Sequence, residues 1–504
     1  MIKKLYKKVK NTFFLNNNEK FFINNYNYED TSDRLNAKKN ILLNATEDYK
    51  TVCFISSLIK DKYFTNKNIV FFLPLLSWHR YSHKKNILIF IFKFYLNQLI
   101  LLFRNKKWKK IYNKFNSEFI LLNNFNILKE IKFLNRAEKI LLSKINTKKD
   151  LQNLKINGIL VGDLIYDTYL RYNEKTTVNL KDIFLIEVLA KTLNSLDKLN
   201  KKKLVFEEIF TNQLAYIYHG LLVRKYKKKK VQVYNFMWTA GPHFAPISRY
   251  FHLYDFMKYK SLFKKEKNKK QKLHEAKLLL ENKFGGKIIP QENFMPVSAY
   301  ENKNQYLPNI LGTIFLHCFV DSPTSRGNCI FVDFEEWIIE TLEYFRKKKV
   351  SHQIAIKPHP DSKEASLVLI KKLKSIYPEF IWLSKNFSNK TIFNKKPFFG
   401  LTVMGTVLHE LAYHNIIPIS AGENSTLNYN FTKTANTKKN YFILIDRAIE
   451  KKLHYLSNKK EILEWVYMTY LYDKSPSKIF CKKIKLKTWD FSKSKALVKL
   501  LDVL

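Results

Sequence analysis

The chain has 504 residues, of which 46% are hydrophobic and 26% are charged, and its formal net charge is +46. This balance of apolar and charged residues is typical of folded proteins and excludes a chain that is disordered throughout. The length exceeds what one ordinary core organises, so we expect two to four domains.

The positive charge has two explanations that the sequence leaves open. A basic surface favours an anionic membrane or a phosphate-bearing ligand as partner. However, the lysines are spread over the whole chain and Gly totals only 11, as an A+T-rich coding sequence produces. The cysteines form no C-x-x-C pair, which argues against a disulfide scaffold and favours a reducing compartment. They are Cys53, Cys318, Cys329 and Cys481.

The N-terminal stretch MIKKLYKKVKNTFF is basic but lacks the apolar core of a signal peptide, so we expect a cytoplasmic protein. The most membrane-like stretch is NILIFIFKFYLNQLILLFR at 86–104, whose polar residues share one helix face. These residues are Asn86, Lys93, Asn97 and Arg104. The pattern predicts an amphipathic helix that either packs on the core or attaches the protein peripherally to an anionic inner membrane.

Strands and helices then alternate along the first half of the chain. The stretch 157–172 predicts a strand that runs into a loop, and 180–199 has the apolar spacing of a helix. A strand at 203–210, a helix at 213–226 and a strand at 229–236 follow. This alternation is the pattern of parallel βαβ units.

The second half repeats the alternation after a surface helix predicted at 258–286. The predicted strands are 312–319, 352–360, 380–384, 398–405 and 416–422, and the predicted helices are 333–349, 364–378 and 406–415. We therefore predict an α/β fold with two Rossmann-like doubly wound lobes that face a central cleft. The expected units are an N-terminal lobe at 1–300, a C-terminal lobe at 301–490 and a closing helix at 491–504.

Lys357 and His359 stand in the stretch AIKPHP, at the carboxyl end of a predicted strand. Open α/β sheets bind ligands at these strand ends. The prolines on both sides of His359 restrict the backbone, so both side chains are presented with little entropy to lose. An ammonium and an imidazole suit a phosphate or a carboxylate; the alternative is a rigid turn with a solvated histidine.

Gly405 and Thr406 join a predicted strand to a predicted helix in GLTVMGTVLHELAYHN. The unpaired N–H groups at a helix start favour an anion, Gly405 permits close approach, and Thr406 can cap the helix or contact a phosphate oxygen. Glu410 follows one turn later, within reach of a ribose hydroxyl. In the loop 317–334, Arg326 is a further candidate for an anionic sugar or phosphate, although a purely structural polar loop explains it equally well.

The N-terminal lobe offers a carboxylate and an imidazole. Asp163 follows a predicted strand end, and glycosyl transfer needs a carboxylate near the anomeric carbon as base or nucleophile. A helix cap with an Asp167–Arg171 surface pair is the alternative. The Gly-Pro loop TAGPHFAPISRY exposes His243, a second catalytic candidate on the acceptor side.

Five stretches together resemble bacterial capsule and surface polysaccharide biosynthesis proteins, the group related to Kdo transferases and glycerophosphotransferases with a two-lobed GT-B fold. They are GILVGDLIYDTYLRY, TAGPHFAPISRY, IFLHCFVDSPTSRGNCIFVDFEEWIIETL, IAIKPHPDS and GLTVMGTVLHELAYHNIIPISAG. The resemblance implies a C-terminal lobe that binds a nucleotide-activated sugar and an acceptor-side N-terminal lobe with Asp163 as catalytic carboxylate. The implied donor-binding residues are Lys357, His359, Gly405, Thr406, Glu410 and Arg326.

The resemblance therefore implies a metal-independent glycosyltransferase without a cofactor. The donor would be a nucleotide sugar, with CMP-linked sugars among the candidates, and the acceptor a growing capsular or lipopolysaccharide-type glycan or glycolipid. Two alternatives stay open: a polyol-phosphate transferase that uses a CDP-glycerol or CDP-ribitol type donor, and a basic nucleic-acid-binding protein without catalysis. A non-catalytic scaffold for polysaccharide assembly is a third.

Overall fold

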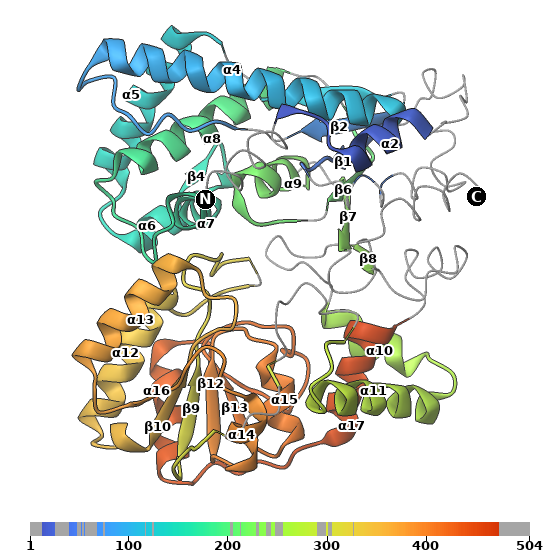
Figure 1. Cartoon of the computed structure of the whole chain (residues 1–504), viewed down its shortest axis with the longest axis vertical. Helices are drawn as coiled ribbons and strands as arrows, with labels where there is room; N and C mark the ends of the chain where they lie inside the picture. Colours follow the sequence, from blue (N-terminus) through green and yellow to red (C-terminus); the bar gives the residue numbers. More distant parts are fainter. Residues whose placement is uncertain are drawn as a thin grey trace.

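The computed structural model describes two α/β lobes, one above the other in Figure 1. The described residues are 13–25, 40–47, 52, 55, 68–73, 76–115, 117–122, 125–201, 205–211, 213–227, 231–237, 243–246, 256–289, 299–300, 305–325 and 327–472. The closing helix predicted at 491–504 lies outside these residues.

The N-terminal lobe is built on a six-stranded sheet. Its strands are β1 (Asn40–Asn44), β2 (Asn68–Leu73), β3 (Glu118–Leu121), β6 (Glu208–Thr211), β7 (Gln232–Met237) and β8 (His243–Pro246). Their order is β3-β2-β1-β6-β7-β8, and all neighbours are parallel except β7 and β8. In the NIVFFL run of β2 every residue after Asn68 is buried, as expected for a strand covered on both faces.

Helices cover both faces of this sheet. They are α2 (Asn17–Asn25), α4 (Ile87–Tyr112), α5 (Ile127–Lys144), α6 (Lys148–Gln152), α7 (Gly162–Asn173), α8 (Ile183–Lys201), the π-helical turn η4 (Tyr216–Gly220) and α9 (Leu221–Lys227). On one face, the ring of Phe71 packs on Tyr112 and Phe115, with centroid distances of 4.7 and 5.7 Å. On the other face, Val70 and Phe72 belong to a core shared with α5, α7, α8 and α9.

The C-terminal lobe repeats this plan with an all-parallel sheet. Its strands are β9 (Gly312–Phe315), β10 (Ile354–Lys357), β11 (Ile381–Trp382), β12 (Phe399–Thr402), β13 (Ile417–Ser420) and β14 (Lys433–Thr434). Their order, β11-β10-β9-β12-β13-β14, is that of a Rossmann-type doubly wound sheet. Two such sheets in one chain confirm the predicted α/β fold class of GT-B-like, doubly wound lobes.

The strands of the C-terminal lobe are also buried on both faces. The covering helices are α12 (Phe334–Lys347), α13 (Glu364–Ile376), α14 (Asn389–Asn394), α15 (Val407–Tyr413) and α16 (Lys438–Ile449). Ile354 and Ile356 join the core under α12, α13 and α16, whereas Ala355 joins the core under α14 and α15. The alternation follows from the two-residue period of a strand.

A small helical layer connects the lobes. It consists of α10 (Tyr259–Lys264), α11 (Lys269–Phe284), α17 (Lys459–Val466) and η8 (Tyr467–Leu471). The ring of Phe263 packs on Tyr467 at 5.8 Å, and Lys260 pairs with Glu461 at 2.6 Å. The chain therefore returns from the second lobe to the segment that follows the first sheet. The prediction of one helix over 258–286 is wrong, because a break at residues 265–268 separates α10 from α11.

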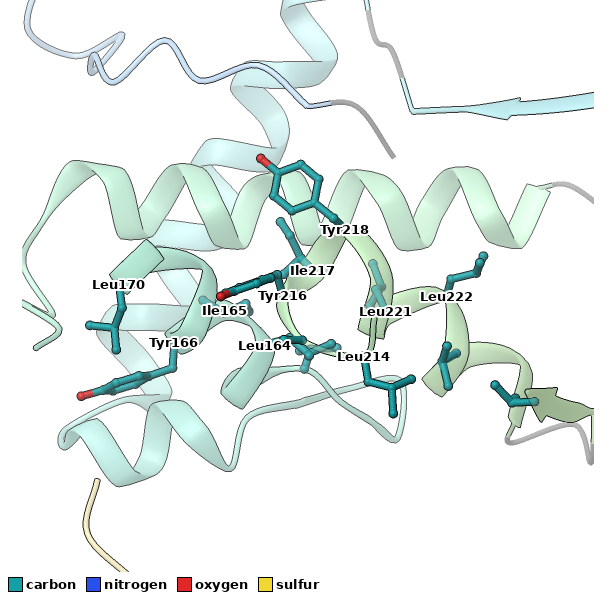
Figure 2. Packing of buried hydrophobic residues seen from close by; sticks show 14 of the residues in the cluster. Leu164, Ile165, Tyr166, Leu170, Leu214, Tyr216, Ile217, Tyr218, Leu221 and Leu222 are labelled. Carbon is teal, nitrogen blue, oxygen red and sulfur yellow. The ribbon is translucent and has the colours of Figure 1, made fainter. Parts of the chain in front are cut away.

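The prediction that 157–172 runs from a strand into a loop is wrong in its second part, because a helix follows the strand. A short hairpin, β4 (Lys155–Ile156) and β5 (Ile159–Leu160), leads directly into α7. Only glycine fits at the first residue of this helix, because a Cβ at Gly162 would lie 1.7 Å from the carbonyl oxygen of Leu151. Figure 2 shows Leu164 of α7 beside Leu214 in the core that this close packing creates. The helix predicted at 86–104 is confirmed as part of α4.

Candidate functional site

The carboxyl ends of β9, β10 and β12 meet at one edge of the C-terminal sheet, because these strands are parallel neighbours. The connections change direction between β9 and β12, and open α/β sheets bind ligands at such a point. The loop after β9 contacts the N-terminal lobe, where Tyr216 donates to Asp321 at 3.1 Å. This edge of the sheet therefore faces the N-terminal lobe.

Lys357 is the last residue of β10, and its side chain is only 3% exposed. Its Nζ donates hydrogen bonds to the carbonyl oxygens of Lys385 at 2.8 Å and Pro358 at 3.2 Å. No carboxylate among the described residues forms an ion pair with it. Burial therefore lowers the pKa of Lys357 to about 8. A buried ammonium held only by carbonyl dipoles is a group that a bound anion would stabilise.

His359 lies two residues after the strand, in a closed turn. Its Nδ1 accepts a hydrogen bond from the backbone N–H of Asp361 at 3.1 Å, so the proton of the neutral ring lies on Nε2. The hydroxyl of Ser362 donates to the carbonyl oxygen of His359 at 2.8 Å. These bonds fix the backbone that the two flanking prolines already restrict, and they make Nε2 the donor of the ring.

His317 follows β9 and holds the neighbouring loop. Its Nε2 accepts hydrogen bonds from the backbone N–H groups of Val403 at 3.2 Å and Met404 at 3.3 Å. The hydroxyl of Thr402 lies 3.0 Å from the same nitrogen. The ring stacks on Phe334 with a centroid distance of 4.4 Å. His317 thus orients the loop after β12 at the point where the sheet changes direction.

Gly405 and Thr406 come directly after that loop. Thr406 is exposed and is the N-cap residue of α15, and its hydroxyl makes no capping bond. Parallel strands lie about 4.8 Å apart, so the ends of β10 and β12, with β9 between them, are separated by roughly 10 Å. The edge therefore presents Lys357, His359 and the Gly405–Thr406 turn within the length of one extended ligand.

Glu410 has a different environment from the predicted contact with a ribose hydroxyl. Its carboxylate is 4% exposed and pairs with Lys283 of α11 at 2.7 Å, while the hydroxyl of Tyr300 donates to the other oxygen. Burial alone would raise the pKa of Glu410, but the charges of Lys283 and His409 and the hydrogen bonds from Lys283 and Tyr300 together outweigh it and lower that pKa. Both oxygens are occupied, so this geometry favours a structural role.

Asp163 also differs from the predicted substrate-facing carboxylate. It lies in the first turn of α7 and is 5% exposed. Arg224 of α9 binds both of its oxygens, one of them from Nη2 at 2.7 Å, and also donates to the carbonyl oxygen of Leu160 at 2.9 Å. A bidentate buried pair of this kind joins α7 to α9 and leaves Asp163 little capacity for a substrate.

Asp167, one turn further along α7, is the carboxyl that meets the other lobe. It is fully buried, and its Oδ2 accepts a hydrogen bond from Thr324 at 2.6 Å. Its Oδ1 has no hydrogen-bond partner within the described part of the chain. Burial raises the pKa of Asp167 well above its usual value, and the nearby charges of Asp163 and Asp321 raise it further.

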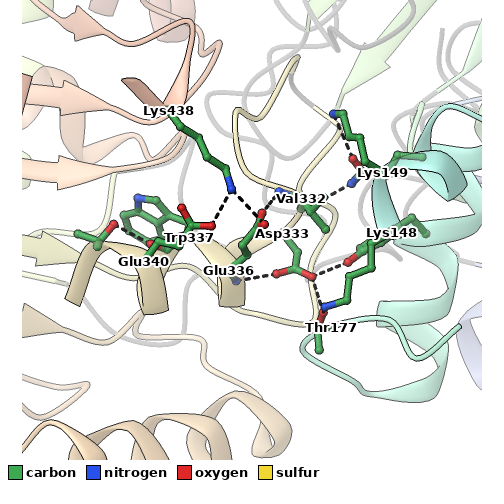
Figure 3. A network of polar contacts seen from close by, with 12 residues as sticks. Lys148, Lys149, Thr177, Val332, Asp333, Glu336, Trp337, Glu340 and Lys438 are labelled. Carbon is green, nitrogen blue, oxygen red and sulfur yellow. Dashed lines mark hydrogen bonds and ion pairs between the residues drawn. The ribbon is translucent and has the colours of Figure 1, made fainter. Parts of the chain in front are cut away.

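A second polar contact fastens the lobes beside Asp167. Asp333, the N-cap residue of α12, accepts hydrogen bonds from the hydroxyls of Tyr166 and Thr177, the latter at 2.6 Å. On the C-terminal side, Lys438 of α16 pairs with Glu336 at 3.1 Å (Figure 3). The start of α12, at the end of the loop after β9, is therefore held from both lobes.

The side chains of two predicted site residues lie outside the described part of the structure. Arg326 lies outside the described residues, and His243 is described only as a backbone position in β8. Among the residues that are described, no three His, Cys, Asp or Glu side chains gather in a way that could hold a metal ion.

Asp167 and His317 are the candidate residues that the sequence reasoning missed. The sequence pattern indicates Asp167 only as part of a surface pair with Arg171. Its spacing of four residues from Asp163 was a usable signal, since it places both carboxyls on one face of α7. His317 falls near the carboxyl end of the predicted strand 312–319, and that position marks it as a residue of the candidate ligand-binding edge.

No protein-family model and no curated protein matches the sequence. Among solved structures, the beta Kdo 2,7 transferase KpsC of Thermosulfurimonas dismutans is 13% identical, with a TM-score of 0.31 over 55% of this chain and 81% of its own. The N-terminal domain of Candida albicans trehalose-6-phosphate phosphatase is 9% identical, with a TM-score of 0.30 over 92% and 98% of the two chains.

A UDP-forming alpha,alpha-trehalose-phosphate synthase from Burkholderia vietnamiensis is 7% identical, with a TM-score of 0.27 over 92% of this chain and 100% of its own. The similar structures thus include a Kdo transferase and a trehalose-phosphate synthase. Similarity at this level does not establish function, so the fold assignment rests on the two strand orders and the function must be argued from the residues.

Proposed function

We propose that the chain is a glycosyltransferase that moves a sugar from a nucleotide-activated donor to a surface glycan of the capsular or lipopolysaccharide type. The observation that carries the proposal is Lys357: a buried ammonium at the carboxyl edge of a Rossmann-type sheet, bound within the described part of the chain only to carbonyl oxygens. A phosphate of the donor supplies the negative charge that this position lacks.

The chemistry follows from where charge develops. When the bond between the sugar and the donor phosphate breaks, negative charge grows on the phosphate oxygen, and fixed donors that point at it lower the barrier. Lys357 supplies a full charge and Nε2–H of His359 a hydrogen bond. The Gly405–Thr406 turn contributes backbone N–H groups and a hydroxyl on the other side of β9. No metal or cofactor is required in this scheme.

The acceptor side needs a carboxyl from the N-terminal lobe, and we assign it to Asp167 in preference to Asp163. Arg224 occupies both oxygens of Asp163, whereas Asp167 lies at the lobe contact with one oxygen unpaired among the described residues. A carboxyl with a raised pKa near a reacting sugar can act as an acid or, once ionised, as a base. His243 and Arg326 stay predictions for the acceptor and donor sides respectively.

A donor panel tests the proposal. The full chain is incubated with CMP-, CDP-, UDP- and GDP-linked sugars and with CDP-glycerol, and nucleotide release is measured. We expect one sugar nucleotide to be consumed, and Lys357→Met and His359→Ala to reduce the rate by about a hundredfold or more. Lys363→Met is the matched control, because Lys363 is an exposed lysine that pairs with Asp361 at 3.1 Å.

The outcomes separate the alternatives. Consumption of CDP-glycerol alone would indicate a polyol-phosphate transferase, and full turnover in both site variants would remove the donor site from this edge. Filter binding to DNA or RNA at physiological salt tests the nucleic-acid reading, which predicts tight binding that Lys357→Met leaves unchanged.

A further inference from the structure

We propose that the outer face of helix α4 rests in the surface of an anionic lipid membrane. This helix (Ile87–Tyr112) is the longest in the described part of the chain and runs along the side of the N-terminal lobe opposite the C-terminal lobe (Figure 1). By length and composition alone it could cross a bilayer. Its two faces show why it lies in the membrane plane instead.

The outer face is an unbroken apolar stripe. Its seven side chains are between 44% and 73% exposed: Leu88, Phe92, Tyr95, Leu96, Leu99, Leu102 and Phe103. Their spacings of three and four residues place them on one side of the helix, over a length of about 22 Å. Soluble proteins rarely expose a contiguous apolar surface of this kind unless it binds something.

The inner face fixes α4 to the lobe along its length. Phe90, Leu101 and Trp108 are no more than 4% exposed. Lys107 forms a buried ion pair with Glu19 of α2 at 3.0 Å. A helix that crossed the bilayer would have to give up these contacts and place the paired charges in lipid, which is costly. The geometry therefore favours a helix that lies parallel to the membrane with one face immersed.

Lysines mark both ends of the stripe. Lys85 precedes it, Lys106 and Lys110 follow it on the same side of the helix, and all three are exposed. The helix contains no Asp or Glu. Lysine stems can extend along an apolar surface and place their charges at the level of lipid phosphates. A second copy of the same face would bring lysines against lysines, so an anionic bilayer is the better partner.

Vesicle binding tests this inference without any substrate, so its result is independent of the proposed function. The full chain is sedimented with vesicles of phosphatidylcholine alone or mixed with phosphatidylglycerol. We expect binding to the anionic vesicles. The double variant Phe92→Glu and Leu99→Glu should lower the partition coefficient by about a hundredfold or more, since two large apolar contacts are lost.

A matched control uses comparably exposed apolar residues on the other lobe. Val368 and Leu456 are 61% and 96% exposed, and Val368→Glu with Leu456→Glu should bind anionic vesicles like the unmodified protein. Replacing the three lysines at positions 85, 106 and 110 by Gln should weaken binding to anionic vesicles roughly a hundredfold, with little effect on neutral ones. Circular dichroism melting confirms that each variant is folded.

Three results would overturn the inference. The first is unchanged vesicle binding by the Phe92/Leu99 variant, or no binding by the unmodified protein. The second is light scattering that shows a dimer which the same variant converts to a monomer, without vesicle binding, because the stripe would then be a self-interface. The third is retention in cell membranes after alkaline carbonate extraction, which would indicate that α4 spans the bilayer.

Discussion

Thr324 of the C-terminal lobe donates a hydrogen bond of 2.6 Å to Asp167 of the N-terminal lobe, and this carboxyl is fully buried. The bond joins α7 to the loop that follows the first strand of the second sheet. It therefore places an ionisable group of one lobe directly beside the candidate ligand-binding edge of the other. Burial without a paired cation destabilises the ionised form of a carboxyl. This leads to a specific prediction for Asp167.

Asp167→Asn should raise the melting temperature at neutral pH. The folded-state pKa of Asp167 lies well above its usual value, so the folded protein keeps a proton that the unfolded chain loses above about pH 4. The stability of the unmodified protein therefore falls as pH rises from about 4 towards the raised pKa, and the Asn variant removes this loss. Thermal unfolding followed across that pH range measures the difference.

Glu118→Gln is the control, because Glu118 is exposed on β3 and its substitution should change the melting temperature little. A variant at Asp167 that is more stable but inactive would support both the burial argument and the catalytic assignment. Destabilisation by Asp167→Asn that grows with pH would contradict the account.

Arg224→Leu should destabilise the protein by about 3–5 kcal/mol, because it leaves the Asp163 carboxylate buried without its partner. The double variant with Asp163→Asn should recover part of that loss. Chemical denaturation measures the free energies. If Asp163→Asn instead abolishes turnover while stability is unchanged, Asp163 is the reacting carboxylate that the sequence suggested.

Glu410→Gln should cost stability and leave nucleotide affinity within about twofold, since the carboxylate pairs with Lys283 and does not face a ligand. Thr406→Ala, at the exposed turn before the same helix, should show the opposite pattern. Isothermal titration with the nucleotide that the donor panel identifies compares the two. A tenfold loss of affinity in a fully stable Glu410→Gln protein would restore the predicted ribose contact.

The alternation of apolar runs predicted five of the six strands of the C-terminal sheet, because strands covered on both faces must be continuous apolar segments. In the N-terminal sheet it predicted β6 and β7 but not β1, β2, β3 or β8. It failed at 157–172, where the close contact of Gly162 with Leu151 turns an apolar stretch into a buried helix. Such a tertiary contact is not visible in local periodicity.

The site was predictable as far as it depended on chain position. Lys357, His359 and the Gly405–Thr406 turn follow parallel strands, and topology alone brings strand ends together. The partners of Asp163 and Glu410 come from other elements, Arg224 and Lys283, which local patterns do not connect to them. The buried position of Asp167 was not predictable for the same reason, because it depends on a loop from the second lobe.

The pH dependence of nucleotide binding tests the central claim most directly. If Lys357 binds the donor phosphate, the association constant of the nucleoside diphosphate should be steady below about pH 8 and fall roughly tenfold per pH unit above it, as the ammonium with a pKa of about 8 loses its proton. Lys357→Arg should flatten this profile, and Lys357→Met should bind weakly at every pH. An unmodified protein and a Lys357→Met variant with the same affinity across this range would contradict the assignment.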